Sequence, residues 1–237
     1  MKKFSLITAL CLAGAVSQAQ LVIDDFSGNL SAYTATRILK ATPAAANNTY
    51  AWEISNGALR INTSTYGGIE QYALTRTDFP LSVGFELSAT YSASDLGSQD
   101  LGLYVGAGAP TADVRANYVS IYMRNNGQLY SRGFNGTTEL SLSGGSTPTG
   151  LLSLFVARTG VSTFDLGWYD GNGRNILASR TMTSTTIGDA IGFYGDVRAL
   201  GLRGSMDNLT ITAIPEPTAA ALLGLGSLGL VFRLRRK

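Results

Sequence analysis

The segment LSVGFELSATY, residues 81–91, alternates apolar side chains with small or polar ones. The apolar set occupies every second position: Leu81, Val83, Phe85, Leu87, Ala89 and Tyr91. Successive side chains of a β-strand point to opposite faces of its sheet, so this period of two predicts a strand with one face in a core. The intervening residues, Glu86 among them, are expected on the solvent face.

The same period recurs along the body of the chain, and no segment there has a helical period. Further strands are expected at 21–26, 51–54, 58–62, 68–74, 101–107, 118–124, 128–134, 151–158, 162–169, 175–182, 190–195 and 206–212. Asn125 to Gly127 and Asp170 to Gly173 tolerate positive φ and predict hairpin turns between neighbouring strands. The expected fold is all-β: a two-sheet antiparallel β-sandwich (jelly roll) over residues 20–213.

Composition and charge exclude several classes of function. The 237 residues include no histidine and one cysteine, Cys11, which excludes histidine triads, thiolate chemistry and zinc sites built within the chain from these residues. Setting aside six terminal basic residues leaves 12 basic against 15 acidic residues between positions 20 and 213, a formal charge of −3. Such a domain lacks the electropositive stripe that binds phosphates, so no nucleic-acid partner is expected.

Residues 1–19 have the pattern of a secretory signal peptide. Lys2 and Lys3 precede an apolar segment, and Ser17 and Ala19 are the small residues at the −3 and −1 positions of a cleavage site. Cleavage by signal peptidase is expected after Ala19, which removes Cys11. The alternative is an N-terminal transmembrane anchor, for which the apolar run is short.

The segment after residue 213 has three parts: a proline-glutamate-proline triplet, an apolar run and a basic terminus. An apolar helix of about 218–234 reaches the lower limit for spanning a membrane, and the basic terminus would stay on the cytoplasmic side. The alternatives are a buried terminal helix and a permanent single-span anchor. The order and spacing of the parts resemble the PEP-CTERM sorting signal of bacterial envelope proteins, over residues 214–237. The motif residues are Pro215, Glu216, Pro217, Arg233, Arg235 and Arg236.

That resemblance implies a route and a partner. An exosortase-type membrane protease would recognise Pro215, Glu216 and Pro217 and cleave nearby, because this is how the family's tails are understood to be processed. It implies an inner-membrane intermediate, held by the C-terminal helix, and then a place at the cell surface or in the extracellular matrix of a Gram-negative bacterium. Many carriers of the signal are associated with exopolysaccharide.

The body is similar to concanavalin-like and laminin-G-like sandwiches and to carbohydrate-binding modules. The segments that carry the likeness are DDFSG (24–28), AWEISNGALRI (51–61) and MDNLTI (206–211). The match is to a pattern of strands, and a fold does not fix a function.

The first and last strands of many sandwiches are neighbours, and this arrangement suggests a candidate structural Ca²⁺ site. It would bring together Asp24, Asp25, Asp207 and Asn208, whose oxygens suit a hard cation. The alternative is that these are polar residues of edge strands that face solvent or cap turns. The loop DGNGRN (170–175) lacks the carboxylates of a calcium loop and is interpreted as a hairpin turn.

Aromatic side chains on an outward face could stack against sugar rings. Candidates in or beside the middle strands are Tyr104, Tyr122, Tyr130, Trp168 and Tyr169, with packing in the core as the alternative for each. A glycoside hydrolase needs two carboxylates roughly 5 to 9 Å apart. Glu53, Glu70, Glu86 and Glu139 are scattered along the sequence and form no known glucanase motif.

The sequence therefore predicts an exported, non-catalytic surface or matrix protein that binds or structures exopolysaccharide. The alternative is a secreted glycan-active enzyme, a hydrolase or lyase, on the same scaffold. Two facing carboxylates in a groove would favour the enzyme.

Overall fold

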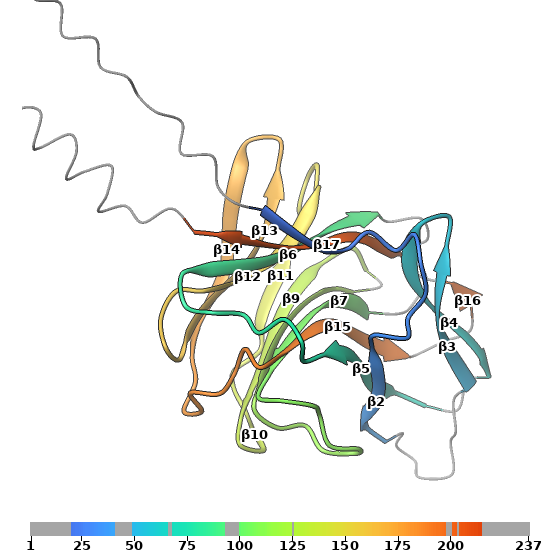
Figure 1. The fold of residues 1–237 in the computed structure, drawn as a ribbon, viewed down its shortest axis with the longest axis horizontal. Coiled ribbons are helices and arrows are strands. Elements are labelled where there is room, and N and C mark those ends of the chain that lie inside the picture. Colours follow the sequence, from blue (N-terminus) through green and yellow to red (C-terminus); the bar gives the residue numbers. More distant parts are fainter. Residues whose placement is uncertain are drawn as a thin grey trace, which may run out of the picture.

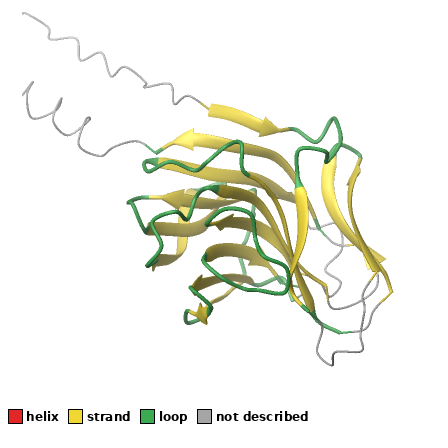
Figure 2. Cartoon of the chain, turned by 60° about the horizontal axis from the view of Figure 1, so that its bottom comes forward, coloured by secondary structure: helices red, strands yellow, loops and turns green. Residues whose placement is uncertain are grey.

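A computed structural model describes residues 20–40, 49–65, 68–92, 100–124, 126–197, 201–202 and 204–214. Its strands form two antiparallel sheets packed face to face, the β-sandwich that the alternating sequence predicts (Figure 2). No helix in the described part of the chain is long and apolar enough to cross a membrane. The predicted signal peptide and the PEP-CTERM tail lie outside the described residues.

The nine-stranded sheet has the order β14-β13-β12-β6-β17-β4-β16, with β1 paired to β17 and β3 paired to β4. Its strands are β1 (Gln20–Asp24), β3 (Thr49–Ser55), β4 (Ala58–Thr65), β6 (Phe85–Ser92), β12 (Ser153–Arg158), β13 (Thr163–Asp170), β14 (Gly173–Thr181), β16 (Gly201–Leu202) and β17 (Ser205–Ala213).

The eight-stranded sheet has the order β10-β9-β8-β7-β15-β5-β2, with β11 paired to β9. Its strands are β2 (Thr34–Leu39), β5 (Glu70–Arg76), β7 (Asp100–Gly106), β8 (Tyr118–Met123), β9 (Leu129–Asn135), β10 (Thr138–Glu139), β11 (Ser143–Ser146) and β15 (Ala190–Val197).

Each strand expected from the sequence has a counterpart, and both expected hairpins are present. Gly127 takes φ 76° between β8 and β9, and Asp170 pairs with Gly173 across the β13–β14 turn. The Asp170 carboxylate accepts hydrogen bonds from the backbone N–H groups of Asn172 and Gly173, which explains this loop as a turn. The pattern does not predict β2, β10, β11 and β16, of which the last three are too short to show alternation.

The segment 81–91 differs from its expected form in where the strand begins and in the burial of Val83 and Glu86. The strand β6 begins at Phe85, because Val83 and Gly84 form a turn in which Gly84 takes φ 82°. Val83 is therefore 46% exposed and not on the core face, whereas Leu81 remains buried. Glu86, expected in solvent, is only 6% exposed.

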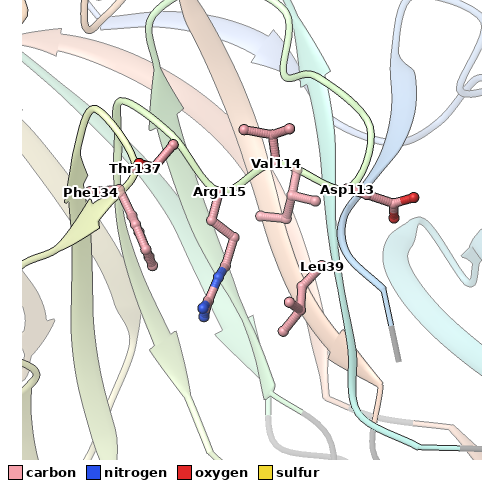
Figure 3. Close-up of a pocket in the computed structure, with 7 residues that line it drawn as sticks. Leu39, Asp113, Val114, Arg115, Phe134 and Thr137 are labelled. Carbon is pink, nitrogen blue, oxygen red and sulfur yellow. The ribbon is translucent and has the colours of Figure 1, made fainter. Parts of the chain in front are cut away.

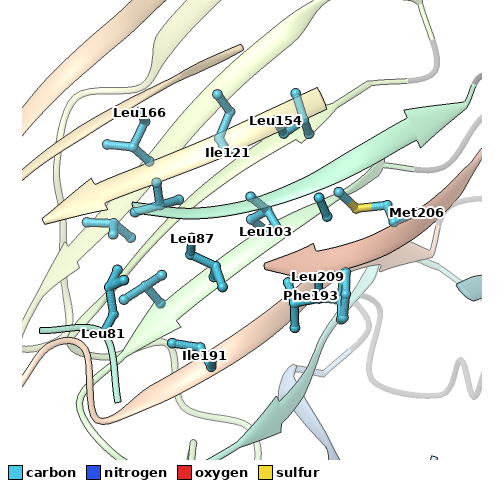
Figure 4. Close-up of a cluster of buried hydrophobic side chains, with 14 of the residues drawn as sticks. Leu81, Leu87, Leu103, Ile121, Leu154, Leu166, Ile191, Phe193, Met206 and Leu209 are labelled. Atoms are coloured by element: carbon cyan, nitrogen blue, oxygen red, sulfur yellow. The ribbon is translucent and has the colours of Figure 1, made fainter. Parts of the chain in front are cut away.

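The core lies between the inner faces of the two sheets. Figure 4 shows side chains from both meeting there: Leu87 and Leu154 come from the nine-stranded sheet, and Leu103, Ile121 and Phe193 come from the eight-stranded one. All five are 0% exposed. Burial of this apolar surface is the main term that stabilises the sandwich.

The two ends of the described chain lie side by side. Gln20 of β1 pairs with Thr212 of β17, so the strand that follows the predicted signal peptide is a neighbour of the strand that precedes the tail. Figure 1 shows β1 and β17 side by side at one edge of the molecule. The expectation that the first and last strands are neighbours is confirmed.

We predict that Leu103→Ala lowers the free energy of unfolding by about 2–5 kcal/mol, because it leaves a cavity in a close-packed core. Leu152, which is 55% exposed, is the matched control, and Leu152→Ala is expected to change stability by less than about 0.5 kcal/mol. Urea denaturation of the three proteins measures both values. Equal losses for the two substitutions would contradict this location of the core.

Candidate functional site on the outer face of the eight-stranded sheet

The outward side of the eight-stranded sheet carries a set of aromatic rings, here called the aromatic face. Alternation along β7, β8, β9 and β15 sends one set of side chains into the core and the other outward. The outward set forms a second buried cluster, separate from the core, with Ile38 and Ala73 at its side. The aromatic face consists of Tyr104, Tyr118, Tyr122, Tyr130, Phe134 and Tyr194.

Glycines between the tyrosines allow the rings to lie close together. Gly102 of β7 pairs with Tyr194 on one side and with Tyr122 on the other, and those two ring centroids are 4.9 Å apart. A Cβ atom on Gly106 would lie 2.6 Å from the Tyr104 ring, so this position also needs glycine. The rings thus fill the space that missing side chains leave on the sheet.

Burial of these rings affects both their access and their ionisation. Tyr104 and Tyr122 are each 1% exposed, and Tyr130 is half-buried. Burial raises the pKa of Tyr122 to about 12 and raises the pKa of Tyr194 well above its usual value. The hydroxyl groups are therefore neutral near pH 7, and the faces of the most buried rings are closed to a ligand.

Three arginines cover the aromatic face. The guanidinium carbon of Arg115 lies 4.8 Å from the Phe134 centroid, that of Arg124 lies 4.8 Å from Tyr130, and that of Arg132 lies 5.8 Å from Tyr122. Arg132 also donates a hydrogen bond of 3.1 Å to the Tyr194 hydroxyl. A guanidinium packs well on an aromatic ring, so these cations cover rings that include two of the candidates for sugar stacking, Tyr122 and Tyr130.

A hollow of about 370 Å³ opens at this face (Figure 3). It lies between the strand β2, the loop that precedes β8, and the end of β9. Its lining is Ile38, Leu39, Asp113, Val114, Arg115, Phe134 and Thr137. The volume is within the range of small-molecule sites, and the lining combines apolar walls with a few polar groups.

An ion pair fixes the loop that forms one wall of the hollow. Arg37 of β2 holds Asp113 with two hydrogen bonds, 2.7 Å from Nε to Oδ1 and 3.0 Å from Nη2 to Oδ2. The backbone N–H of Asp113 also donates to the Arg37 carbonyl oxygen, at 2.8 Å. These bonds lower the pKa of the Asp113 carboxyl, which is ionised at neutral pH.

The aromatic residues proposed from the sequence divide between the two sheets. Tyr104, Tyr122 and Tyr130 belong to the aromatic face, whereas Trp168 packs against the main core from β13. Tyr169 lies on the nine-stranded sheet, where its hydroxyl donates 2.8 Å to the Glu86 carboxylate. Tyr118, Phe134, Tyr194 and the covering arginines are not among the residues predicted from the sequence, although the period of YVSIYMR places Tyr118 and Tyr122 on one face.

The outer side of the nine-stranded sheet holds a second polar cluster around Glu86. Arg174 Nε lies 3.1 Å from Glu86 Oε2, and Arg174 Nη2 lies 3.9 Å from Asp165 Oδ2. Asp165 also accepts a hydrogen bond of 2.6 Å from the Ser179 hydroxyl. Both carboxylates are thus engaged by neighbours, and they do not line the hollow.

The acidic residues proposed for calcium each accept hydrogen bonds from residues close to them in sequence. Asp24 lies opposite Leu209 in the β1–β17 pair, and its carboxylate accepts the Phe26 N–H at 2.8 Å. Asp25 is bonded within its own turn to Ser27, and Asp207 accepts both N–H groups that Asn208 offers it. Among the described residues, no group of three or more acidic, cysteine or histidine side chains could hold a metal ion.

Glu86 gives a prediction about pH. Burial raises its pKa above the ordinary value of 4.5, so the folded protein holds more protons than the unfolded chain just above that pH. The stability contributed by Glu86 should therefore fall as the pH rises from about 4.5 through the raised pKa, by up to about 1.4 kcal/mol for each pH unit. Urea unfolding between pH 4 and pH 7 measures this. The free energy of unfolding of Glu86→Gln should rise relative to that of the wild type as the pH increases.

The control for that series is Glu53→Gln on β3, which corrects for the loss of one acidic charge. The raised pKa would be contradicted if the difference in free energy of unfolding between the two proteins stayed constant with pH, or if the wild type became the relatively more stable one as the pH rose.

Comparisons with known proteins agree with the fold and with the tail. The sequence model of the PEP-CTERM protein-sorting motif matches residues 213–237. No curated protein matches the chain in sequence.

Three solved structures of similar fold have low sequence identity to this chain. The metal-free VIP36 exoplasmic/lumenal domain is 11% identical, covers 83% of this chain and 92% of its own, and has a TM-score of 0.52. The legume lectin-like domain from Entamoeba histolytica is 7% identical over 77% of this chain and 90% of its own, with a TM-score of 0.51. The CBM2 module of Lactobacillus casei BL23 phage J-1 evolved Dit is 9% identical over 85% and 100%, also at 0.51.

At these identities the likeness concerns the fold alone, whereas the tail is matched in sequence. The motif indicates export and passage through a membrane-anchored stage for sorting. The chain is therefore a β-sandwich whose fold is similar to that of lectin domains, and it carries a C-terminal PEP-CTERM protein-sorting motif.

Proposed function

We propose that this is a non-catalytic glycan-binding protein of the cell surface or extracellular matrix, and that it binds its ligand in the hollow of the eight-stranded sheet. The observation that carries the proposal is the lining of the hollow. Ile38, Leu39 and Val114 supply apolar walls, and Asp113, Arg115 and Thr137 supply groups that can hydrogen-bond. A sugar presents the matching combination of C–H surfaces and hydroxyl groups.

Structures of similar fold support the class of ligand. Two VIP36 structures are Ca²⁺-bound forms, and one of them also holds Man3GlcNAc; their TM-scores against this chain are 0.52 and 0.51. For this chain the glycan, its identity as exopolysaccharide and the structural Ca²⁺ are proposals. The described acidic residues supply no ready calcium cluster, so a metal would need ligands beyond those residues.

The carboxylates favour binding over hydrolysis. A glycosidase needs one carboxyl group free to give a proton and another free to attack the sugar or activate water. Glu86 is engaged by Tyr169 and Arg174, and in the hollow Asp113 is held by Arg37 through both oxygens. In the hollow, a glycan-active enzyme would need Asp113 released from Arg37 and a second free carboxylate near it.

The geometry of the ends suits a displayed binding domain. The chain enters the sandwich at β1 and leaves it at β17, both in the nine-stranded sheet, whereas the hollow lies on the outer side of the other sheet. A tail held at the inner membrane and then processed by an exosortase-type protease would leave the hollow open to the surroundings.

A glycan array with the full-length protein in detergent tests the binding proposal. We expect at least one glycan to bind and Val114→Trp to weaken it about tenfold or more, because the indole would fill the hollow. Val161→Trp is the control, since Val161 is 60% exposed and does not line the hollow. Binding to no glycan, or equal effects of the two substitutions, would remove the support for this site.

The same array with and without Ca²⁺ tests the metal. If the protein holds a structural calcium ion, chelation should lower both the melting temperature and the binding signal. An unchanged melting temperature after chelation would contradict the calcium proposal.

Replacement of Pro215, Glu216 and Pro217 by alanine tests the sorting route. We expect the unprocessed protein to accumulate in the inner membrane, because the protease would no longer recognise the tail. Immunoblots of membrane and surface fractions measure this, with the Leu152→Ala protein as a folded control. Normal processing of the triple variant would argue against the motif as the sorting determinant.

A further inference from the structure

We propose that the hollow takes an acidic saccharide, and that the guanidinium of Arg115 binds the carboxylate of a uronate unit there. This rests on the proposed function and narrows it to one class of ligand. The basis is a difference between the two charged groups that line the hollow. Asp113 forms a close ion pair with Arg37, whereas the ion pair of Arg115 is long.

The negative charge of the hollow is already neutralised. Both Asp113 oxygens accept hydrogen bonds from Arg37, in the forked geometry that guanidinium and carboxylate groups favour. Lys40 adds a further positive charge near Asp113, as its effect on the Asp113 pKa shows. A cationic ligand would therefore meet little uncompensated negative charge.

The positive charge of Arg115 is only weakly compensated. Its ion pair is with Glu139, where Nη1 and Oε2 are 3.9 Å apart, at the outer limit for such contacts. The other Glu139 oxygen, Oε1, lies only 2.8 Å from Nε of Arg132. Glu139 is thus more closely paired with Arg132, and Arg115 keeps donor capacity for a ligand.

The Phe134 ring holds the Arg115 guanidinium in place. The guanidinium carbon lies 4.8 Å from the ring centroid, a cation–π contact that leaves the N–H groups as possible donors to a ligand. A carboxylate in the hollow could accept hydrogen bonds from two of these groups side by side. Thr137 and the apolar walls would then contact the hydroxyls and C–H surfaces of the sugar.

The negative formal charge of the domain limits the attraction for an acidic ligand to the surroundings of Arg115. Between residues 20 and 213 the formal charge is −3, so the attraction for an anion would come from the hollow and not from the domain as a whole. Short oligosaccharides are therefore the suitable probes. Because the contact joins two charged groups, their binding should weaken as salt is added.

Isothermal titration of the full-length protein in detergent tests the inference. The probes are short oligomers of galacturonate, glucuronate and mannuronate, each compared with the same oligomer after its carboxyl groups have been reduced to alcohols. We expect at least one uronate to bind, its reduced form to bind about tenfold or more weakly, and Arg115→Gln to lose about 10-fold to 100-fold in affinity.

Arg124→Gln is the matched control. Arg124 also stacks at 4.8 Å on a ring of the aromatic face, its side chain is 26% exposed against 28% for Arg115, and it does not line the hollow. It should keep the affinity for the uronate within about threefold. Melting temperatures of both variants check that each is folded.

The outcomes separate this inference from the proposed function. Equal binding of native and reduced oligomers, tighter binding of a sulfated oligosaccharide, or equal losses for the two arginine variants would overturn the uronate assignment. Binding of neutral glycans on the array without any uronate binding would also overturn it and leave the proposed function standing. Failure of every glycan would remove both.

Discussion

The contact between tyrosine rings across glycines of the eight-stranded sheet is the feature on which the candidate binding face depends. Gly102 lies between Tyr122 and Tyr194 in the strand ladder, and the two rings meet over it. The rings make an apolar layer outside the sheet, so the central strands are buried on both sides. Arginines then cover that layer, and their charge decides what the surface offers a ligand.

Much of the fold could be predicted because a period of two reports directly which side chains share a face. It predicts the main strands of both sheets and the β13–β14 hairpin at Asp170. The period does not show where a strand begins, and it therefore predicts Val83 in the core. The positive φ of Gly84 makes a turn there, and Val83 is exposed. The alternation also predicts Glu86 in solvent. Tyr169 and Arg174, which come from distant segments, cover its carboxylate instead.

The candidate site was harder to predict because its decisive contacts join residues far apart in sequence. The pattern brings Tyr104, Tyr122 and Tyr130 to one face, but it does not show that these rings would be covered. The contact of Arg132 with Tyr194 spans 62 residues, and that of Arg37 with Asp113 spans 76. Sequence patterns of short range therefore identify an aromatic face and miss the cations above it.

The covering arginines change the chemistry that the aromatic face can offer. An exposed tyrosine row would favour neutral sugars, because stacking needs no charge. Guanidinium groups lie over three of the rings, those of Phe134, Tyr130 and Tyr122. Each of these groups blocks stacking on its ring and offers N–H donors, which favour acceptors that carry negative charge. Where a neighbouring carboxylate already takes those donors, the contact is structural. Arg115 differs because its carboxylate partner is closer to Arg132, and so it is the arginine from which ligand selectivity can arise.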